Sequence, residues 1–458
     1  MEGILNFNDW LNGIVWGPPM LILLVGTGVF FTVWSGAFQV SRIGVWWKAT
    51  FGALFSGKKG EKNIDGNITP FQAVTTAMAA TVGVGNIAGV ATAIVLGGPG
   101  AVFWMWMSGF FGMMTKYAEV VLAVKYRETD ANGVYHGGPM YYMRNGLKSK
   151  GLGKVMAVIF SVFGALAAFG IGNMTQSNAI AGSLESTFSI PPLATGIVIA
   201  ALTALVIIGG IKRIASVTEK LVPFMAIFYF LGGLAIIIAH ADKLAGAFGA
   251  IFSNAFSFQS VGGGIMGYVI MRAMRYGVAR GVFSNEAGLG SAPIAHAASR
   301  NKDPVNQGLW GVFEVFVDTL IICTISALVI LTAGLYEGGL SGAPLTIASF
   351  EGTFGTFGAY FVSIAILCFA GSTIISWSYY GQQCLGYLTN KSKSLELGYK
   401  LIFCGLIVVG AIGGLTLVWD IADTLNGLMA IPNLIALILL SKVVMGMTKE
   451  YLSRDKLK

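Results

Sequence analysis

Long apolar runs separated by short polar segments dominate the chain from end to end. A helix needs about 20 apolar residues to cross the hydrocarbon core of a bilayer. The first uncharged run covers Ile14–Ala37, and the run at Ile68–Thr115 is long enough for two spans, which Gly97–Gly100 divides. Further spans are predicted near 154–182, 194–211, 216–240, 262–298, 307–334, 356–388, 398–418 and 424–446. The pattern therefore predicts an all-α integral membrane protein with 11 transmembrane helices.

The composition supports this class. Of the 458 residues, 55% are hydrophobic and 11% are charged, whereas a soluble domain carries about one quarter charged residues. The cysteines lie in apolar runs without metal-ligand spacing, so we interpret them as buried apolar side chains. The sequence contains no recognisable pairing of a nucleophile with a base and no metal triad. Neither an enzyme nor a bound cofactor is expected.

The basic residues indicate an orientation in the membrane. With the N-terminus outside, 24 of the 29 Lys and Arg fall on the cytoplasmic side, among them Lys58, Lys59 and Lys62. The outer loops hold only Lys243, and four basic residues fall within spans: Lys116, Arg272, Arg275 and Arg280. This asymmetry predicts a multi-pass protein with its N-terminus outside and its C-terminus in the cytoplasm. The net charge of +8 reflects this topology and does not indicate a nucleic-acid partner.

Two helix starts carry capping signals. Thr69–Gln72 (TPFQ) places an N-cap Thr before a Pro at the first helical position and a Gln at the third. Ser216–Glu219 (SVTE) has the same Ser/Thr-x-x-Glu/Gln spacing. We therefore expect helices to begin near residues 70 and 217.

Without the first span, the predicted helices divide into two groups of five. Residues 1–66 carry the outward N-terminus, the extra helix and a cytoplasmic loop; residues 67–242 and 243–446 carry one group each, and residues 447–458 form a basic cytoplasmic tail. Five crossings per group make the two groups enter the membrane from opposite faces, as inverted repeats do. Each group opens with a strongly interrupted span, at Thr81–Asn86 (TVGVGN) and Phe283–Gly290 (FSNEAGLG). Paired interruptions of this kind indicate the binding site of a secondary transporter.

Backbone chemistry explains this indication. In hydrocarbon, an unwound segment persists only where it lines a cavity or contacts a ligand, because its N–H and C=O groups need partners. Gly83 and Gly85 allow the chain to leave helical geometry and to approach a ligand closely. The N–H groups that begin a half-helix favour a carboxylate, and the carbonyls that end the preceding one suit an ammonium group or Na+. One broken helix can therefore bind both ends of a zwitterion.

Helix packing is the alternative explanation for these glycines. Gly85 and Gly89 fit the small-xxx-small pattern of packed membrane helices, and this pair alone favours packing. The second polar, glycine-rich interruption in the other half shifts the interpretation towards a binding site.

Five segments resemble the sodium:alanine/glycine symporter family: GGPGAVFWMWMSGFFG at Gly97–Gly112, HGGPMYYM at His136–Met143, SNEAGLGSAP at Ser284–Pro293, EVFVDT at Glu314–Thr319 and GSTIISWSYYG at Gly371–Gly381. They are spread over nearly the whole chain, and the first is close to the family signature, departing from it at Gly109. The resemblance implies the leucine-transporter fold: one peripheral helix and a five-plus-five inverted-repeat core whose first and sixth helices are broken.

The same resemblance implies roles for the residues of the two breaks. In the first break, the amides around Gly83, Val84 and Gly85 would receive a substrate carboxylate, and the carbonyl of Thr81 would meet its ammonium group. In the second, one residue would roof the pocket while neighbouring carbonyls and a hydroxyl hold the ammonium group or a cation; the residues concerned are Phe283, Ser284, Glu286 and Gly288.

A sodium site is also implied. Ser372 and Thr373 resemble a hydroxyl pair that binds Na+ together with the carbonyls of Ala79 and Val82, and Asn86 is a further candidate ligand. Neutral oxygens suit a hard cation, because they supply ligands without burying a charge.

Other polar residues in the spans are candidates with open alternatives. Asn173 and Gln176, with Asn178, form a polar patch for which substrate contact and interhelical hydrogen bonding are equally open. Trp377 follows Thr373 by one turn and could close the pocket against a small side chain.

Charged residues in the spans are functional candidates by default. Glu286 could face an ammonium group, a cation or a proton, and Asp318 is a weaker candidate. Arg272, Arg275 or Arg280 could pair with Asp420 or Asp423 as an outer gate, although snorkelling or a structural ion pair fits equally well.

The combined prediction is a secondary active symporter of the cell membrane. It would couple Na+ entry to the uptake of small neutral amino acids, alanine and glycine, by alternating access. A proton-coupled carrier in which Glu286 or Asp318 titrates is the alternative. A channel fits less well, because the polar residues cluster at two breaks and do not line a continuous path.

Overall fold

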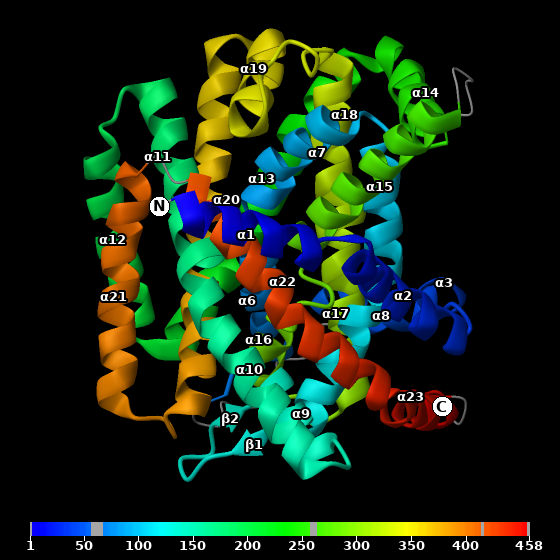
Figure 1. Ribbon diagram of the computed structural model, residues 1–458, viewed down its shortest axis with the longest axis vertical. Helices are drawn as coiled ribbons and strands as arrows, with labels where there is room; N and C mark the ends of the chain where they lie inside the picture. The colour runs from blue at the N-terminus through cyan, green and yellow to red at the C-terminus, as the bar shows by residue number, and fades with distance from the viewer. Residues whose placement is uncertain (1, 56–66, 257–262, 414–415, 456–458) are drawn as a thin grey trace.

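The computed structural model of the chain describes residues 2–55, 67–256, 263–413 and 416–455, and these residues are almost entirely helical (Figure 1). Two short antiparallel strands, β1 (Glu128–Thr129) and β2 (Tyr135–His136), form a hairpin. The basic residues Lys58, Lys59, Lys62, Lys456 and Lys458 lie outside the described residues.

The helices follow the order that the apolar runs predict. The first part of the chain forms α1 (Glu2–Val15), α2 (Pro18–Trp34), α3 (Phe38–Ser41), α4 (Ile43–Ala49), α5 (Phe51–Phe55), α6 (Pro70–Thr81), the π-turn η1 (Gly85–Gly89), α7 (Val90–Gly97), α8 (Ala101–Lys125), α9 (Pro139–Gly146), α10 (Lys150–Phe169), the π-turn η2 (Gly170–Met174), α11 (Thr175–Phe188), α12 (Pro192–Ile207) and α13 (Gly210–Ala239). The remainder forms the 3-10 turn η3 (Ala241–Lys243), α14 (Leu244–Ala255), α15 (Gly263–Asn285), α16 (Ala292–Ala297), α17 (Pro304–Val315), the π-helix η4 (Phe316–Cys323), α18 (Thr324–Ala333), α19 (Gly342–Phe354), α20 (Thr356–Leu388), α21 (Lys393–Ile412), α22 (Thr416–Leu439) and α23 (Ser441–Asp455).

Among the described residues, 7 helices are long and apolar enough to cross a membrane, and the count is 8 if α6 and the segment Gly85–Gly97, bent by 49°, form one span. Helix α12 is apolar but shorter, and α8 and α15 are not among these helices. The protein is therefore a multi-pass membrane protein, and the count of eleven spans stays a prediction. The first predicted span corresponds to α2, which begins at Pro18 because Pro18 and Pro19 favour the first turn of a new helix.

One of the two capping predictions is confirmed. Thr69 and Gln72 form a reciprocal capping box, with both hydrogen bonds at 3.0 Å, and Pro70 occupies the first helical position. The prediction at Ser216–Glu219 is wrong, because α13 begins at Gly210 and runs through this segment. The hydroxyl of Thr218 instead lies 3.0 Å from that of Thr76, so it links two helices.

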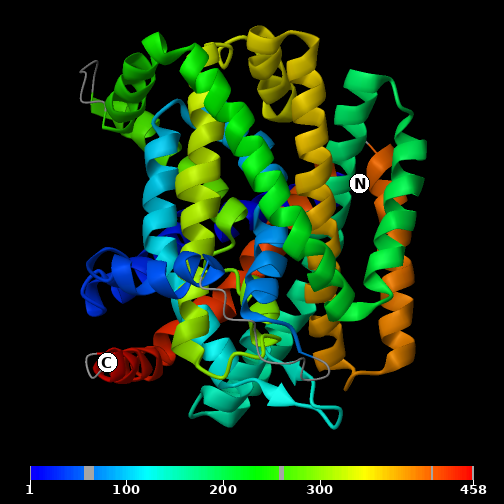
Figure 2. The same cartoon turned by 180° about the vertical axis from the view of Figure 1, so that it is seen from behind.

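The two ends of the helix bundle differ. Helices α14 and α19 lie at one end, and the β1–β2 hairpin, α9 and α23 lie at the other, which we call the hairpin end (Figures 1 and 2). Helices α6 and α16 lie in the middle of the bundle (Figure 1). Arg127 fastens the hairpin to the segment after α16 by donating to the carbonyls of Ala297, Ser299 and Asn301. The hairpin end is therefore tied directly to the broken-helix region.

His136 joins the hairpin to α20. Its Nδ1 lies 3.0 Å from Oε1 of Gln383, and its Nε2 lies 3.0 Å from Oδ2 of Asp130. Burial raises the pKa of Asp130, but hydrogen bonds from His136 and from backbone N–H groups outweigh it, so this pKa lies below its usual value. His136 therefore acts as a structural link in this loop.

Candidate functional site

The first break is a three-residue interruption between α6 and η1. The N–H of Gly83 donates to Oδ1 of Asn86 at 2.8 Å, and the N–H of Asn86 donates to the carbonyl of Gly83 at 3.2 Å. The Asn86 side chain thus replaces a helical partner at the point where the chain unwinds. Because its oxygen is occupied by Gly83, Asn86 holds the shape of the break.

The second break separates α15 from α16 over residues 286–291. Glu286, Gly288 and Gly290 have positive φ values of 55°, 93° and 83°. A Cβ at position 288 would also lie 2.8 Å from the side chain of Leu24, so both backbone conformation and space require glycine there. An interruption is therefore present in the predicted segment Phe283–Gly290, but it begins at Glu286, because Phe283, Ser284 and Asn285 still belong to α15.

The carboxylate of Asp318 in η4 joins the two breaks. Its Oδ1 accepts a hydrogen bond from Nδ2 of Asn86 at 2.7 Å. Its Oδ2 accepts from the hydroxyls of Ser284 at 2.9 Å and Thr319 at 2.8 Å. Asp318 is fully buried, and its described donors are all neutral. It therefore places a carboxyl group at the meeting point of the broken helices.

Neutral oxygens gather where α20 meets the end of α6. The hydroxyls of Ser372 and Thr373 each donate to the carbonyl of Ala79 at 3.1 Å, and Thr373 also lies 3.3 Å from the carbonyl of Ala80. Both hydroxyls contact the carbonyl of Phe369, at 2.8 and 3.0 Å. This group of carbonyls and hydroxyls is the kind of donor set that hard cations prefer. We call Ala79, Phe369, Ser372 and Thr373 the oxygen cluster.

The carbonyl groups of Phe369 and Val82 differ from the Na+ ligand set that the sequence predicts. The carbonyl of Phe369 was not predicted, although serine and threonine in helices commonly bond a carbonyl three or four residues earlier. Val82 lies beside the cluster in sequence, and its N–H donates to the carbonyl of Met78 at 2.7 Å. No hydrogen bond among the described residues links the Val82 carbonyl to the cluster.

Gly83 lies against the oxygen cluster. A Cβ at this position would lie 2.5 Å from Oγ1 of Thr373 and 3.6 Å from Oε1 of Gln176. The Gln176 side chain donates to the carbonyl of Ile171 at 2.9 Å, and its buried oxygen has no partner among the described residues. Gln176 therefore presents a free acceptor beside the first break.

Gly85 lies against the second break. A Cβ there would lie 3.1 Å from the ring of Phe283 and 3.3 Å from Cα of Ser284, whereas a Cβ at Gly89 would meet nothing within 4 Å. The close approach is therefore made by Gly85 alone, and it brings the two breaks together. The packing explanation for the Gly85–Gly89 pair fits only its first member.

Glu286 and Trp377 form a direct contact between the second break and α20. Nε1 of Trp377 donates to Oε1 of Glu286 at 2.8 Å, and the hydroxyl of Ser291 donates to the other carboxylate oxygen. A Cβ at Gly172 of η2 would lie 2.3 Å from Cβ of Trp377, so the indole packs directly on that glycine. Both carboxylate oxygens of Glu286 thus have partners within the protein.

Asn173 lies on a different side of its helix. Its Nδ2 donates to the carbonyl of Phe403 in α21 at 2.7 Å, and none of the described contacts brings it to the breaks. Asn178 likewise donates to the carbonyls of Gly410 and Gly413, at 3.3 and 2.9 Å. For these two residues, interhelical hydrogen bonding describes the observed contacts.

Glu119 in α8 holds the second break, and the sequence reasoning missed it. Its Oε1 accepts from the N–H groups of Gly288 and Gly290 at 3.1 and 3.0 Å, and from Nδ2 of Asn433 at 2.6 Å. Asn433 also donates to the carbonyl of Gly288 at 2.9 Å. Both backbone groups of Gly288 are therefore engaged by the protein. A carboxylate within a span is itself a signal, and it applies to Glu119 as it does to Glu286.

Another buried carboxylate, that of Glu314, contacts a lysine and a histidine. Its Oε1 lies 3.3 Å from Nζ of Lys116, and its Oε2 lies 3.0 Å from Nε2 of His296. All three side chains are fully buried. Glu314 and Asp318 lie one turn apart, but only Glu314 has an ion pair among the described residues.

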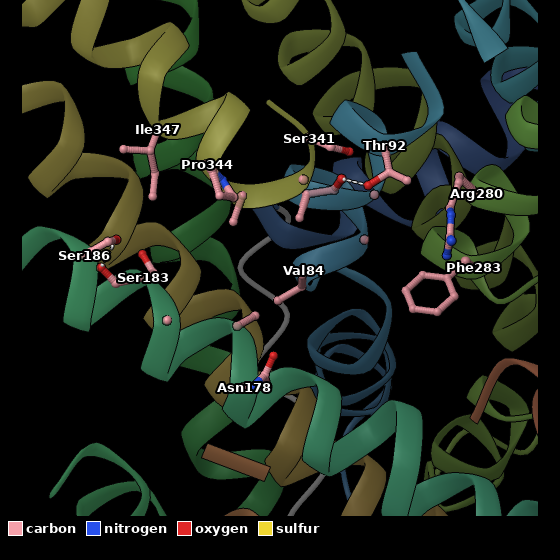
Figure 3. A pocket seen from close by; sticks show the side chains of 17 residues that line it. Val84, Thr92, Asn178, Ser183, Ser186, Arg280, Phe283, Ser341, Pro344 and Ile347 are labelled. Atoms are coloured by element: carbon pink, nitrogen blue, oxygen red, sulfur yellow. Dashed lines mark hydrogen bonds between the residues drawn. The ribbon is translucent and has the colours of Figure 1, made fainter. Parts of the chain in front are cut away.

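A cavity of about 510 Å³ opens beyond the breaks, on the side of α19. It is lined by residues of η1, α11, α15 and α19, among them Gly85 and Phe283 close to the two breaks, and by Val84 of the first break. Figure 3 shows Arg280 and Phe283 on one side of it, opposite Asn178, Ser183 and Ser186 of α11. The cavity therefore leads to the region where the two breaks meet.

One of the predicted charge pairs is present beside this cavity. Nη1 of Arg280 lies 3.8 Å from Oδ2 of Asp423, and its guanidinium lies 5.4 Å from the centre of the Phe283 ring. Arg272 and Arg275 instead approach the ring of Tyr276, each at 5.9 Å. Of the three arginines, Arg280 is therefore the one that lines the cavity and contacts Phe283.

Comparisons with known proteins agree with this arrangement. The model of the sodium:alanine symporter family matches residues 1–458. The chain is 51% identical over 445 residues to the sodium/alanine symporter AgcS of Methanococcus maripaludis, covering 96% of both chains. It is 46% identical to an uncharacterized transporter of Haemophilus influenzae, covering 100% of this chain and 97% of that one. Among solved structures, MhsT in complex with L-phenylalanine has a TM-score of 0.56 at 15% identity, covering 81% of this chain and 88% of that chain. The likeness to MhsT shows the leucine-transporter fold alone.

Proposed function

The chain belongs to the sodium:alanine symporter family, and we propose that it takes up alanine and glycine together with Na+ around the two helix breaks. The observation that carries this proposal is the hydrogen-bonded chain Asn86–Asp318–Ser284, which joins both breaks within the bundle. The region between the breaks is thereby surrounded by unwound backbone from two helices, a free hydrogen-bond acceptor and neutral oxygens. A zwitterion and a cation need this combination of groups.

The substrate carboxylate binds at the start of η1. The first N–H groups of a helical segment have no partner within it and form its positive end. Those of Val84 and Gly85 are in this position, while the N–H of Gly83 is taken by Asn86. The ammonium group lies on the other side, against the carbonyl of Thr81, the free oxygen of Gln176 and the region of Ser284. Phe283 covers the substrate on the side of the cavity.

The coupling Na+ binds in the oxygen cluster, with the carbonyl of Val82 as an additional ligand. The hydroxyls of Ser372 and Thr373 donate to the carbonyl of Ala79. When Na+ binds, these hydroxyl hydrogens turn away and the same oxygens face the ion. The preference for Na+ follows from neutral oxygen ligands, which require no buried charge.

Asp318 is the place for a second cation. A buried charge without a counter-charge is costly in the membrane, and Asp318 receives only neutral donors among the described residues. A second Na+ or a proton at this carboxylate removes that cost. The proton-coupled alternative is retained here, and it predicts uptake without Na+.

Alternating access requires that the two five-helix repeats, 67–242 and 243–446, move around this fixed site. The distribution of basic residues supports a cytoplasmic position for the hairpin end, and in this orientation the cavity beside α19 opens outwards. Residues 1–66 add a peripheral helix, and the tail from 447 continues α23 as far as Asp455. The substrate enters past Arg280 and Phe283.

Arg280→Gln is expected to raise the alanine KM about two- to fivefold with little change in maximal rate. The pair with Asp423 is partly exposed, and such pairs contribute about 0–1 kcal/mol, so the effect is modest. Uptake kinetics in proteoliposomes measure it. Arg454→Gln removes the exposed pair with Glu450 at the other end and serves as the control. Equal KM values for Arg280→Gln and the wild type would remove Arg280 from the entry path.

Proteoliposome uptake tests the proposed function itself. An inward Na+ gradient is expected to drive saturable alanine uptake with counterflow. Each neutral zwitterion that enters with one Na+ moves one charge, worth about 2.3 kcal/mol per 100 mV, so a current accompanies uptake. Uptake that follows a pH gradient equally well without Na+ would favour the proton-coupled alternative, and non-saturating flux would favour a channel.

A further inference from the structure

We infer that Glu286 is a positioning residue: its carboxylate fixes the indole of Trp377, and this indole limits the transported amino acid to a small side chain. The inference rests on the proposed alanine site. In this inference, Glu286 acts by positioning the side chain of Trp377. The sequence alone predicted that its carboxylate could face an ammonium group, a cation or a proton.

Trp377 on α20 and Glu286 in the second break border the substrate region, as their positions along the packed segments show. Trp377 follows Thr373 by one turn of α20, and Gly172 precedes Gln176 by one turn, a rise of about 5.4 Å. Glu286 follows Ser284 in the second break. Trp377, Gly172 and Glu286 therefore form a layer directly beside the layer of Thr373, Gln176 and Ser284, where the amino acid binds.

Three contacts hold the indole in one orientation. The Gly172 backbone lies so close that an added Cβ would be 2.3 Å from Cβ and 2.4 Å from Cγ of Trp377. The Tyr380 ring lies at a centroid distance of 5.5 Å in an edge contact. The Nε1–Oε1 hydrogen bond of 2.8 Å to Glu286 fixes the remaining rotation. Trp377 is therefore a rigid wall that cannot turn aside for a larger side chain.

Each carboxylate oxygen of Glu286 already accepts a hydrogen bond from a side chain of the protein. Oε1 accepts from Trp377 and the other oxygen accepts from Ser291. Turning the carboxylate towards an ammonium group would leave the buried indole N–H without an acceptor, which is unfavourable. Glu286 also holds a left-handed backbone conformation, with φ of 55°, at the first residue of the break. That conformation is uncommon for a residue with a side chain and directs this one towards α20.

The test compares the kcat/KM of alanine with that of valine in proteoliposomes. Trp377→Phe and Glu286→Ala are each expected to narrow the alanine-to-valine ratio about tenfold, because small size differences in a hydrophobic pocket discriminate by about 10- to 200-fold. The double variant is expected to match the single ones, since both changes release the same wall. Glu286→Gln keeps an acceptor oxygen for the indole, so it is expected to restore the ratio to within about threefold of the wild type.

Trp46→Phe is the matched control. Trp46 is fully buried and its Nε1 donates to the carbonyl of Gln39 at 2.9 Å, so this variant loses an equivalent hydrogen bond away from the breaks. Its ratio is expected to equal that of the wild type.

Two results would overturn the inference. Ratios that stay unchanged in Trp377→Phe and Glu286→Ala would show that the indole does not limit size. A Glu286→Gln variant as impaired as Glu286→Ala would show that the charge itself is needed. If Glu286→Ala fails to reach the membrane, Trp377→Phe and Glu286→Gln decide the question. A wild type without alanine uptake would reject the proposed function as well, whereas normal uptake with unchanged ratios rejects this inference alone.

Discussion

Gly83→Ala is expected to lower Na+-driven alanine uptake about 5- to 150-fold. The added Cβ would lie 2.5 Å from Oγ1 of Thr373, closer than any ordinary contact of a Cβ. Thr373 cannot simply turn away, because its hydroxyl is held by the carbonyls of Ala79, Ala80 and Phe369. Overpacking of this kind costs about 1–3 kcal/mol, and each 1.36 kcal/mol in the barrier is a factor of ten in rate. The methyl group disturbs the first break and the oxygen cluster at once.

Initial uptake rates at equal amounts of reconstituted protein measure this effect. Gly371→Ala is the control, because Gly371 lies beside Ser372 on α20 and a Cβ there meets nothing within 4 Å. We expect Gly371→Ala to transport at close to the wild-type rate. Full activity in Gly83→Ala would mean that the first break does not approach α20 as described.

Thr373→Ala is expected to raise the Na+ concentration for half-maximal alanine uptake about 10- to 100-fold. The change removes one oxygen of the cluster and leaves buried carbonyls without their donor. Such a loss costs about 1–3 kcal/mol, and 1.4 kcal/mol corresponds to a tenfold change in affinity. Alanine binding at saturating Na+ is expected to remain, because the substrate groups at Val84, Gly85 and Gln176 are untouched.

The Na+ dependence of alanine binding to purified protein measures this second effect. Thr373→Ser keeps the hydroxyl and is expected to restore Na+ affinity to within about threefold of the wild type. An unchanged Na+ response in Thr373→Ala would place the coupling ion elsewhere, with Asp318 as the next position to test.

Local signals in the sequence predict the breaks and the start of α6 correctly. The capping box at Thr69 depends on residues three apart, and the glycines around Gly83 and Gly288 disfavour a regular helix. The resemblance to the symporter family adds the pairing of Ser372 and Thr373 with Ala79, a contact across 293 residues that no local pattern contains. These are the parts of the candidate site that the sequence could supply.

The partners of the buried carboxylates could not be predicted, because they depend on packing between distant helices. Glu119 meets Asn433 across 314 residues, and Glu286 meets Trp377 across 91. A carboxylate within a membrane span indicates a functional or structural role. The sequence does not show whether its partner is a ligand, an indole or a backbone amide. The predicted helix start near residue 217 is wrong for a related reason. Ser216–Glu219 fits a capping pattern, but α13 already begins at Gly210 and continues through this segment.

The most direct test of the account is a distance measurement between alanine and the backbone of the first break. Solid-state NMR of [1-13C]alanine bound to protein labelled with 15N-glycine and 15N-valine detects amides close to the carboxylate carbon. With N–H···O distances of about 2.9 Å, the amides of Val84 and Gly85 fall within about 4 Å of that carbon. The account predicts Na+-dependent dephasing from both labels, lost in Gly83→Ala. Bound alanine without dephasing from either label would contradict it.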